Sequence, residues 1–159
     1  MTAQPVASTY NVGQPVALRY ALASINGGYD IALATVTAML DNGSGGARAR
    51  VLAPGEPFPY GAAPVLVGET SLFSARRLEG LLQVWGPRPR PWLVWVADAP
   101  IRPVQDARFL IRALEGRLAG VARVPYLPVL RAVEGPDEAL EYRDVQAAGE
   151  KLRRTIEGN

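Results

Sequence analysis

The side chains that perform most enzyme chemistry are missing or rare in this chain of 159 residues. It contains no histidine and no cysteine, and Lys151 is its only lysine. These absences exclude imidazole general bases, thiolate nucleophiles, disulfides and the usual zinc and haem ligands. Lys151 also falls in the last predicted helix, far from any loop that could bind phosphate. We therefore predict no catalytic residue, no cofactor and no metal site.

Acidic residues are the next candidates, and Asp30, Glu69 and Asp98 each follow a predicted strand or turn. Asp98 comes after the most apolar strand, and ligands of open α/β sheets bind at the carboxyl ends of strands. Asp98 is therefore the best single candidate for a ligand contact, although a cap for the following turn or helix is the favoured interpretation. Two carboxylates that converged at ~5 to 9.5 Å could bind a cation or act as acid and base. The spacing does not require convergence, and unrelated surface acids are favoured.

Aromatic and arginine side chains supply candidate contacts with a partner. The aromatic ones lie at the entrance of a strand or among the prolines of residues 54–60, where partial exposure would let them anchor an interface. The arginines lie on a helix face that we expect to be solvated, from which a guanidinium could bind a partner's carboxylate. These candidates are Trp92, Phe58, Tyr60, Arg76 and Arg77.

The elements that must position these side chains alternate between strand and helix over the C-terminal part of the chain. Short apolar runs bounded by glycine or proline predict strands at residues 64–68, 92–97 and 121–124, and apolar spacings of three and four predict helices at residues 71–85, 103–118 and 136–156. The run at residues 92–97 has no polar alternation, which indicates a strand covered on both faces. We therefore predict a single three-layer α/β domain, with a mostly parallel sheet of about 4–5 strands and crossover helices.

The N-terminal third is less regular. Residues 16–23 fit a strand or two helical turns, and we favour the strand. A turn at residues 26–28 leads into a predicted helix at 31–40, a glycine-rich loop at 41–46 and a second strand at 48–53. The four prolines of residues 54–64 predict an irregular surface connection.

This strand, turn and helix have the layout of a phosphate-binding unit. The turn reads Asn26-Gly27-Gly28-Tyr29-Asp30-Ile31-Ala32. It resembles the K-G-G-x-G-K-T turn of the deviant-Walker ATPases of the ParA and MinD family. An ordinary turn explains the same residues equally well, because Asn and Gly tolerate positive φ.

The two central glycines are kept, but the residues that would touch phosphate or magnesium differ. Asn26 stands where the family has its signature lysine, and Asp30 stands where it has the third glycine. Ile31 stands where the family has the P-loop lysine, and Ala32 stands where it has the magnesium-binding Thr or Ser. Two unit charges 4 Å apart interact by roughly 4 kcal/mol near a protein surface, so a carboxylate at this turn opposes phosphate binding.

The rest of the chain resembles the same family in the order of its elements. Residues 123–128 resemble the turn that lies beside the nucleotide base in these ATPases. The stretch at residues 53–64 is too short for the family's middle strands and their water-activating aspartate.

The resemblance implies a shortened, catalytically inactive ParA/MinD-like pseudo-ATPase. Such a domain would bind proteins or act as a scaffold in DNA or plasmid partition or in mobile-element transfer. Two other functions stay open: a structural subunit that uses residues 54–60 and the tryptophans, or a small ligand-binding domain or enzyme that uses the sheet edge near Asp98. We expect a protein partner or self-association.

Composition sets the remaining expectations. The net charge is +2 and the arginines are spread among acids, which does not support a nucleic-acid surface. Residues 1–10 lack the basic and apolar regions of a signal peptide, and no apolar run approaches the length of a membrane span. We therefore predict one cytoplasmic domain over residues 1–159 that makes no membrane contact, with a flexible segment at residues 1–14.

Overall fold

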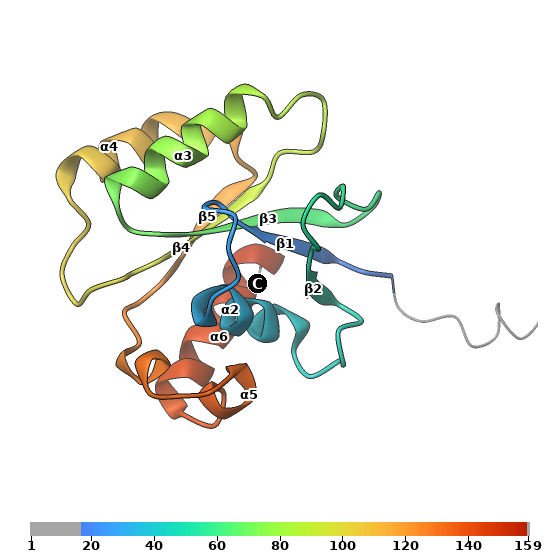
Figure 1. Cartoon of the computed structure of the whole chain (residues 1–159), viewed down its shortest axis with the longest axis vertical. Coiled ribbons are helices and arrows are strands. Elements are labelled where there is room, and N and C mark those ends of the chain that lie inside the picture. Colours follow the sequence, from blue (N-terminus) through green and yellow to red (C-terminus); the bar gives the residue numbers. More distant parts are fainter. Residues whose placement is uncertain (1–16, 159) are drawn as a thin grey trace, which may run out of the picture.

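The computed structural model describes residues 17–158, which form a five-stranded sheet with helices on both faces (Figure 1). In chain order the elements are β1 (Tyr20–Ser24), α2 (Ile31–Asp41), β2 (Ala49–Val51), β3 (Ala63–Glu69), α3 (Leu72–Gln83), β4 (Trp92–Val96), α4 (Gln105–Leu114), the 3₁₀ turn η1 (Glu115–Arg117), β5 (Gly120–Val124), the 3₁₀ turn η2 (Pro128–Arg131), α5 (Pro136–Ala139) and α6 (Arg143–Glu157). The predicted flexible segment at residues 1–14 and the first residue of the strand predicted at residues 16–23 lie outside this range. Among the described helices, none has the length and apolar character needed to cross a membrane.

The strands are parallel throughout and follow the order β2-β1-β3-β4-β5. Parallel neighbours need crossover connections, which place helices on the faces of the sheet. α2, α5 and α6 cover one face, and α3 and α4 cover the other (Figure 1). The prediction of an α/β domain with a mostly parallel sheet of this size is confirmed.

Alternate residues of the central strands β3 and β4 fill two separate cores, one on each face of the sheet. Val65 and Val67 of β3 pack towards α2 and α6, whereas Leu66 packs towards α3 and α4. β4 is buried in the same two-sided way, and Trp95 is 1% exposed. The absence of polar alternation in β4 therefore follows from helices on both of its faces.

The connection between β2 and β3 is irregular, as its prolines predict. Its conformation is fixed by Glu56, which accepts hydrogen bonds from the Arg50 guanidinium and from the N–H of Ala53. These interactions lower the pKa of Glu56 to about 2, with the Arg50 hydrogen bond as the main cause.

The helix predicted at residues 136–156 is interrupted. α5 ends at Ala139 and α6 begins at Arg143, because Tyr142 adopts an extended conformation with φ −93° and ψ 139°. The side-chain amide of Gln146 donates a hydrogen bond to the carbonyl of Leu140 at 2.7 Å. This carbonyl, which lies near the break, therefore has a hydrogen-bond partner. The predicted apolar stripe is still found on α6, where Leu152 is buried.

The glycine-rich loop after α2 is organised by Asp41. The Asp41 carboxylate accepts hydrogen bonds from Ser44 Oγ and from the backbone N–H groups of Gly46, Arg48 and Ala49 at 2.6–3.1 Å. Burial raises the pKa of this carboxyl, but the hydrogen bonds outweigh burial, and the pKa lies below its ordinary value. Asp41 therefore holds the end of α2 against the start of β2.

We expect Asp41→Asn to destabilise the domain by about 1–2 kcal/mol at neutral pH, because a carboxamide has only one acceptor oxygen for these donors. A carboxyl with a depressed folded-state pKa contributes stability above its unfolded pKa and loses it as the pH falls through the folded-state value. The difference between wild type and variant should therefore shrink below about pH 4. Urea unfolding at pH 7 and pH 3 measures this, and a difference that is unchanged at pH 3 would contradict the ionised role.

Candidate functional site

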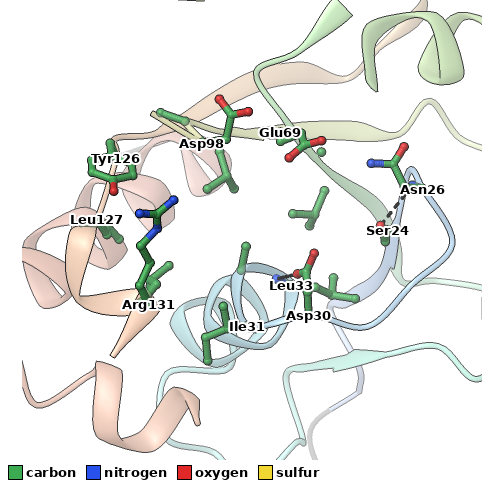
Figure 2. Close-up of a pocket in the computed structure, with 16 residues that line it drawn as sticks. Ser24, Asn26, Asp30, Ile31, Leu33, Glu69, Asp98, Tyr126, Leu127 and Arg131 are labelled. Carbon is green, nitrogen blue, oxygen red and sulfur yellow. Dashed lines mark hydrogen bonds between the residues drawn. The ribbon is translucent and has the colours of Figure 1, made fainter. Parts of the chain in front are cut away.

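The strand order reverses between β1 and β3, and a cavity opens at the carboxyl ends of the strands at this point (Figure 2). α2 follows β1 onto one face and α3 follows β3 onto the other, so their connections diverge and leave a space between them. The cavity has a volume of about 340 Å³. Its polar lining residues are Ser24, Asn26, Asp30, Glu69, Asp98, Tyr126 and Arg131, and its apolar lining includes Ile31, Val67, Val96, Leu127 and Leu130.

The turn from β1 into α2 forms one wall of the cavity. Gly27 has φ +83°, a conformation that side chains rarely adopt, whereas Gly28 has ordinary φ. The N–H of Gly27 donates to the carbonyl of Ser24, and the N–H of Asn26 donates to Ser24 Oγ. Two backbone donors of the turn are therefore used inside the chain.

Asp30 caps the N-terminus of α2. Its carboxylate accepts a hydrogen bond from the N–H of Leu33 at 2.8 Å, and its backbone is extended, as is usual for an N-cap. The dipole of a helix attracts anions to this end, and here the chain's own carboxylate fills that position. Ile31 and Ala32 follow directly and line the cavity without a charge or a hydroxyl group.

The turn is held against α3 by a close approach at Gly68. A β-carbon at this position would lie 2.5 Å from Ile25 Cδ1 and 3.4 Å from Ser74 Oγ. Asn26 Nδ2 also donates to Ser74 Oγ at 3.3 Å. Glycine at the end of β3 therefore lets the turn and α3 meet across the sheet edge.

Asp98 lies in the cavity lining, at the end of β4. Its carboxylate accepts a hydrogen bond from Thr70 Oγ1 at 3.0 Å, which links the ends of β3 and β4. It does not cap α4, whose N-cap is Val104. Of the favoured interpretation, a cap for the following turn or helix, the helix cap is therefore not observed, and Asp98 instead connects two neighbouring strands.

The cavity brings together the three carboxylates that the sequence singled out. Asp30, Glu69 and Asp98 all line it and are exposed to solvent. Within residues 17–158, however, no three acidic side chains are close enough to hold a metal ion. The arrangement can attract a positively charged group and repel an anion such as a triphosphate.

Among the described residues that line the cavity, Arg131 is the one of opposite charge, and no sequence motif predicted it. It lies at the end of η2 and extends from the wall opposite Asp30 (Figure 2). Among the described residues no ion pair joins it to a carboxylate. The resemblance of residues 123–128 to a base-binding turn pointed to this region, but only Tyr126 and Leu127 of that stretch line the cavity.

The other predicted contact residues lie away from the cavity. Phe58 packs on Trp85 with ring centroids 5.3 Å apart, and Arg88 stacks 4.0 Å from the Trp85 centroid. Trp92 is half-buried, with its ring over Gly120 of β5. Much of the surface of Phe58 and Trp92 is therefore buried inside the domain.

Tyr60, Arg76 and Arg77 are exposed. Arg76 pairs with Glu79 at 3.3 Å along the same helix, an exposed pair of the kind that adds little stability. Lys151 is exposed on α6 and is not among the residues that line the cavity.

Comparisons with protein-family models, curated proteins and solved structures give no match to this chain.

We expect Asp30→Ala to destabilise the domain by about 1 kcal/mol, because the N–H of Leu33 loses its partner and the helix dipole loses a compensating charge. Asp30→Ser provides the matched control, since serine also accepts this hydrogen bond, and it should recover most of the loss. Urea unfolding compares the three proteins. If the alanine variant were as stable as the serine variant, Asp30 would not act as the cap.

Proposed function

We propose that the chain is a non-catalytic, ParA/MinD-like binding domain that acts through contacts with proteins, as a scaffold in DNA or plasmid partition or in mobile-element transfer. The observation that supports this most directly is the Asp30 cap. A phosphate-binding loop aims free backbone N–H groups at the anion and adds a lysine charge. In this turn the Asp30 carboxylate accepts a hydrogen bond from the N–H of Leu33, and Ile31 occupies the position where a phosphate loop has its lysine.

The electrostatics of the cavity support the same proposal. A nucleoside triphosphate carries several negative charges, and three carboxylates line the cavity against one arginine. Near a protein surface, each contact between a carboxylate and a phosphate charge opposes binding by roughly a few kcal/mol. The sole lysine lies on α6, outside the lining. Binding and turnover of ATP would therefore need charges that this edge of the sheet does not supply.

Thermal denaturation with ATP or ADP and magnesium tests the proposal. We expect no stabilisation beyond that given by sodium sulfate at the same ionic strength. A nucleotide present at 100 times its Kd would stabilise the folded state by about 2.7 kcal/mol, which such an assay resolves easily. Magnesium-dependent stabilisation by either nucleotide, absent with sulfate, would refute the proposal.

A second candidate function is the binding of a small cationic ligand in the cavity. Its volume of about 340 Å³ lies within the range of small-molecule sites, and its lining combines an apolar floor with Asp30, Glu69 and Asp98. A ligand with an amine and an aliphatic body would match this lining.

Agmatine, a cation with an aliphatic chain, is a suitable probe for this second function. In NMR titrations we expect saturable shifts at Glu69, Asp98 and Leu127, and Asp98→Asn should weaken them because it removes one carboxylate. Citrate serves as the anionic control and should leave these signals in place. Shifts confined to other acidic surfaces would rule out this site.

A further inference from the structure

The layer formed by α3 and α4 has an unusual concentration of exposed apolar side chains. Eight large hydrophobic side chains are exposed in residues 17–158, and five of them lie on these helices or on the residues that flank them. The five are Phe73, Val84, Ile101, Val104 and Phe109, with exposures of 53–75%. We call this the α3–α4 surface. Aromatic and arginine side chains together are typical of interfaces between proteins.

The chain segment that contains α3 and α4 is basic, although the whole chain is nearly neutral. Residues 70–119, from the end of β3 to the start of β5, contain eight arginines and four acidic residues, a net charge of +4. The rest of the chain contains nine basic and eleven acidic residues, a net charge of −2, which accounts for the overall +2. Among the described residues, Arg76 is the only one of these arginines in an ion pair.

The opposite layer has an acidic counterpart. Residues 134–144, which include α5 and the first turn of α6, contain five acidic residues and one arginine, a net charge of −4. We call this the α5 surface. Four of its acids are exposed, and none forms an ion pair among the described residues. Tyr142 lies among them and is 44% exposed. The net charge of the α5 surface is thus opposite to that of residues 70–119, and Tyr142 adds one exposed aromatic ring.

From this complementarity we propose that the partner of the α3–α4 surface is the α5 surface of a second copy of this chain. The proposal rests on the proposed function as a binding domain and names its partner. Opposite charges on two surfaces steer their encounter and select the matched arrangement over others.

The two surfaces lie on opposite faces of the sheet, so one copy cannot offer both to the same neighbour (Figure 1). The contact is therefore heterologous, with the α3–α4 surface of each copy on the α5 surface of the next. Heterologous contacts that do not close generate open chains of subunits. Stacked copies of this domain would form a scaffold, with the cavity at the sheet edge left free.

Sedimentation of the full chain tests the proposal. We expect the average mass to rise with concentration above the 17.0 kDa of one chain, and to fall as sodium chloride is added. Salt shortens the screening length from about 10 Å at 0.1 M to about 3 Å at 1 M, which weakens contacts between charged surfaces. A wild type that stays monomeric at low salt and high concentration overturns the proposal.

Charge reversal on each surface gives the sharper test. Arg77→Glu with Arg112→Glu changes the α3–α4 surface, and Glu134→Arg with Glu141→Arg changes the α5 surface. These side chains are exposed and make no hydrogen bond or ion pair among the described residues. Each double variant should weaken self-association by roughly tenfold or more. A mixture of the two should associate again, because the unchanged basic surface of one meets the unchanged acidic surface of the other.

Controls separate a lost contact from a lost fold. Lys151→Glu with Arg154→Glu changes the net charge as much as Arg77→Glu with Arg112→Glu does, but the change lies on α6. It should not weaken association. Phe73→Ser with Phe109→Ser removes apolar contact without changing charge, and should weaken it. Circular dichroism checks that every variant is folded. If folded variants fail to associate on mixing, the proposal is wrong.

The remaining outcomes separate this inference from the proposed function. If the wild type is monomeric but binds duplex DNA, the α3–α4 surface takes a polyanion and the self-association proposal is overturned. If it is monomeric and magnesium nucleotides do not stabilise it, only the self-association proposal fails. If it associates but magnesium ATP stabilises it, the self-association proposal stands and the pseudo-ATPase proposal fails.

Discussion

The fold depends on one constraint: neighbouring parallel strands must be joined by connections that cross a face of the sheet. Because the chain moves from β1 to β2 in one direction and from β3 to β5 in the other, its helices divide between the two faces. β3 and β4 are then enclosed on both sides, and their buried positions hold no polar side chain. Polar side chains that follow these strands gather at the carboxyl edge, where the divergent connections of β1 and β3 leave a cavity.

Within that cavity the local chemistry is set by how α2 begins. The N-terminus of a helix attracts anions, and in this chain the Asp30 side chain supplies the negative charge at the start of α2. The same side chain stabilises the helix and places a negative charge at the helix end that attracts anions. At this turn a side chain of the protein therefore fills the position that an anion could take at a helix N-terminus.

The fold could be predicted from the sequence because its strongest signals are local. Apolar runs bounded by glycine and proline gave β3 and β4, and the spacing of three and four gave α3 and the stripe on α6. The break at Tyr142 was missed because the acidic residues Asp137 and Glu138 fit the first turn of a helix and the apolar spacing that follows fits its continuation. Neither pattern reveals an extended residue between them. The candidate site was predicted only in part. Asp30, Glu69 and Asp98 could be placed at the sheet edge by counting strand ends, whereas Arg131 reaches it through a 3₁₀ turn that has no periodic signal. Phe58 was expected at the surface, and its packing on Trp85 depends on where two distant loops meet.

The charge pattern shows the same limit of sequence reasoning at a larger scale. Along the chain the arginines alternate with acids, and their sum is close to zero, which indicates no charged partner. The crossover rule sorts the segments of the chain by face, because α3 and α4 lie on one side of the sheet and α5 and α6 on the other. Segments of opposite charge thereby become opposite faces of the domain, separated by the whole sheet. Residues 70–119 and 134–144 carry net charges of +4 and −4, which cancel in a sum over the sequence but lie on different sides of the sheet in the fold.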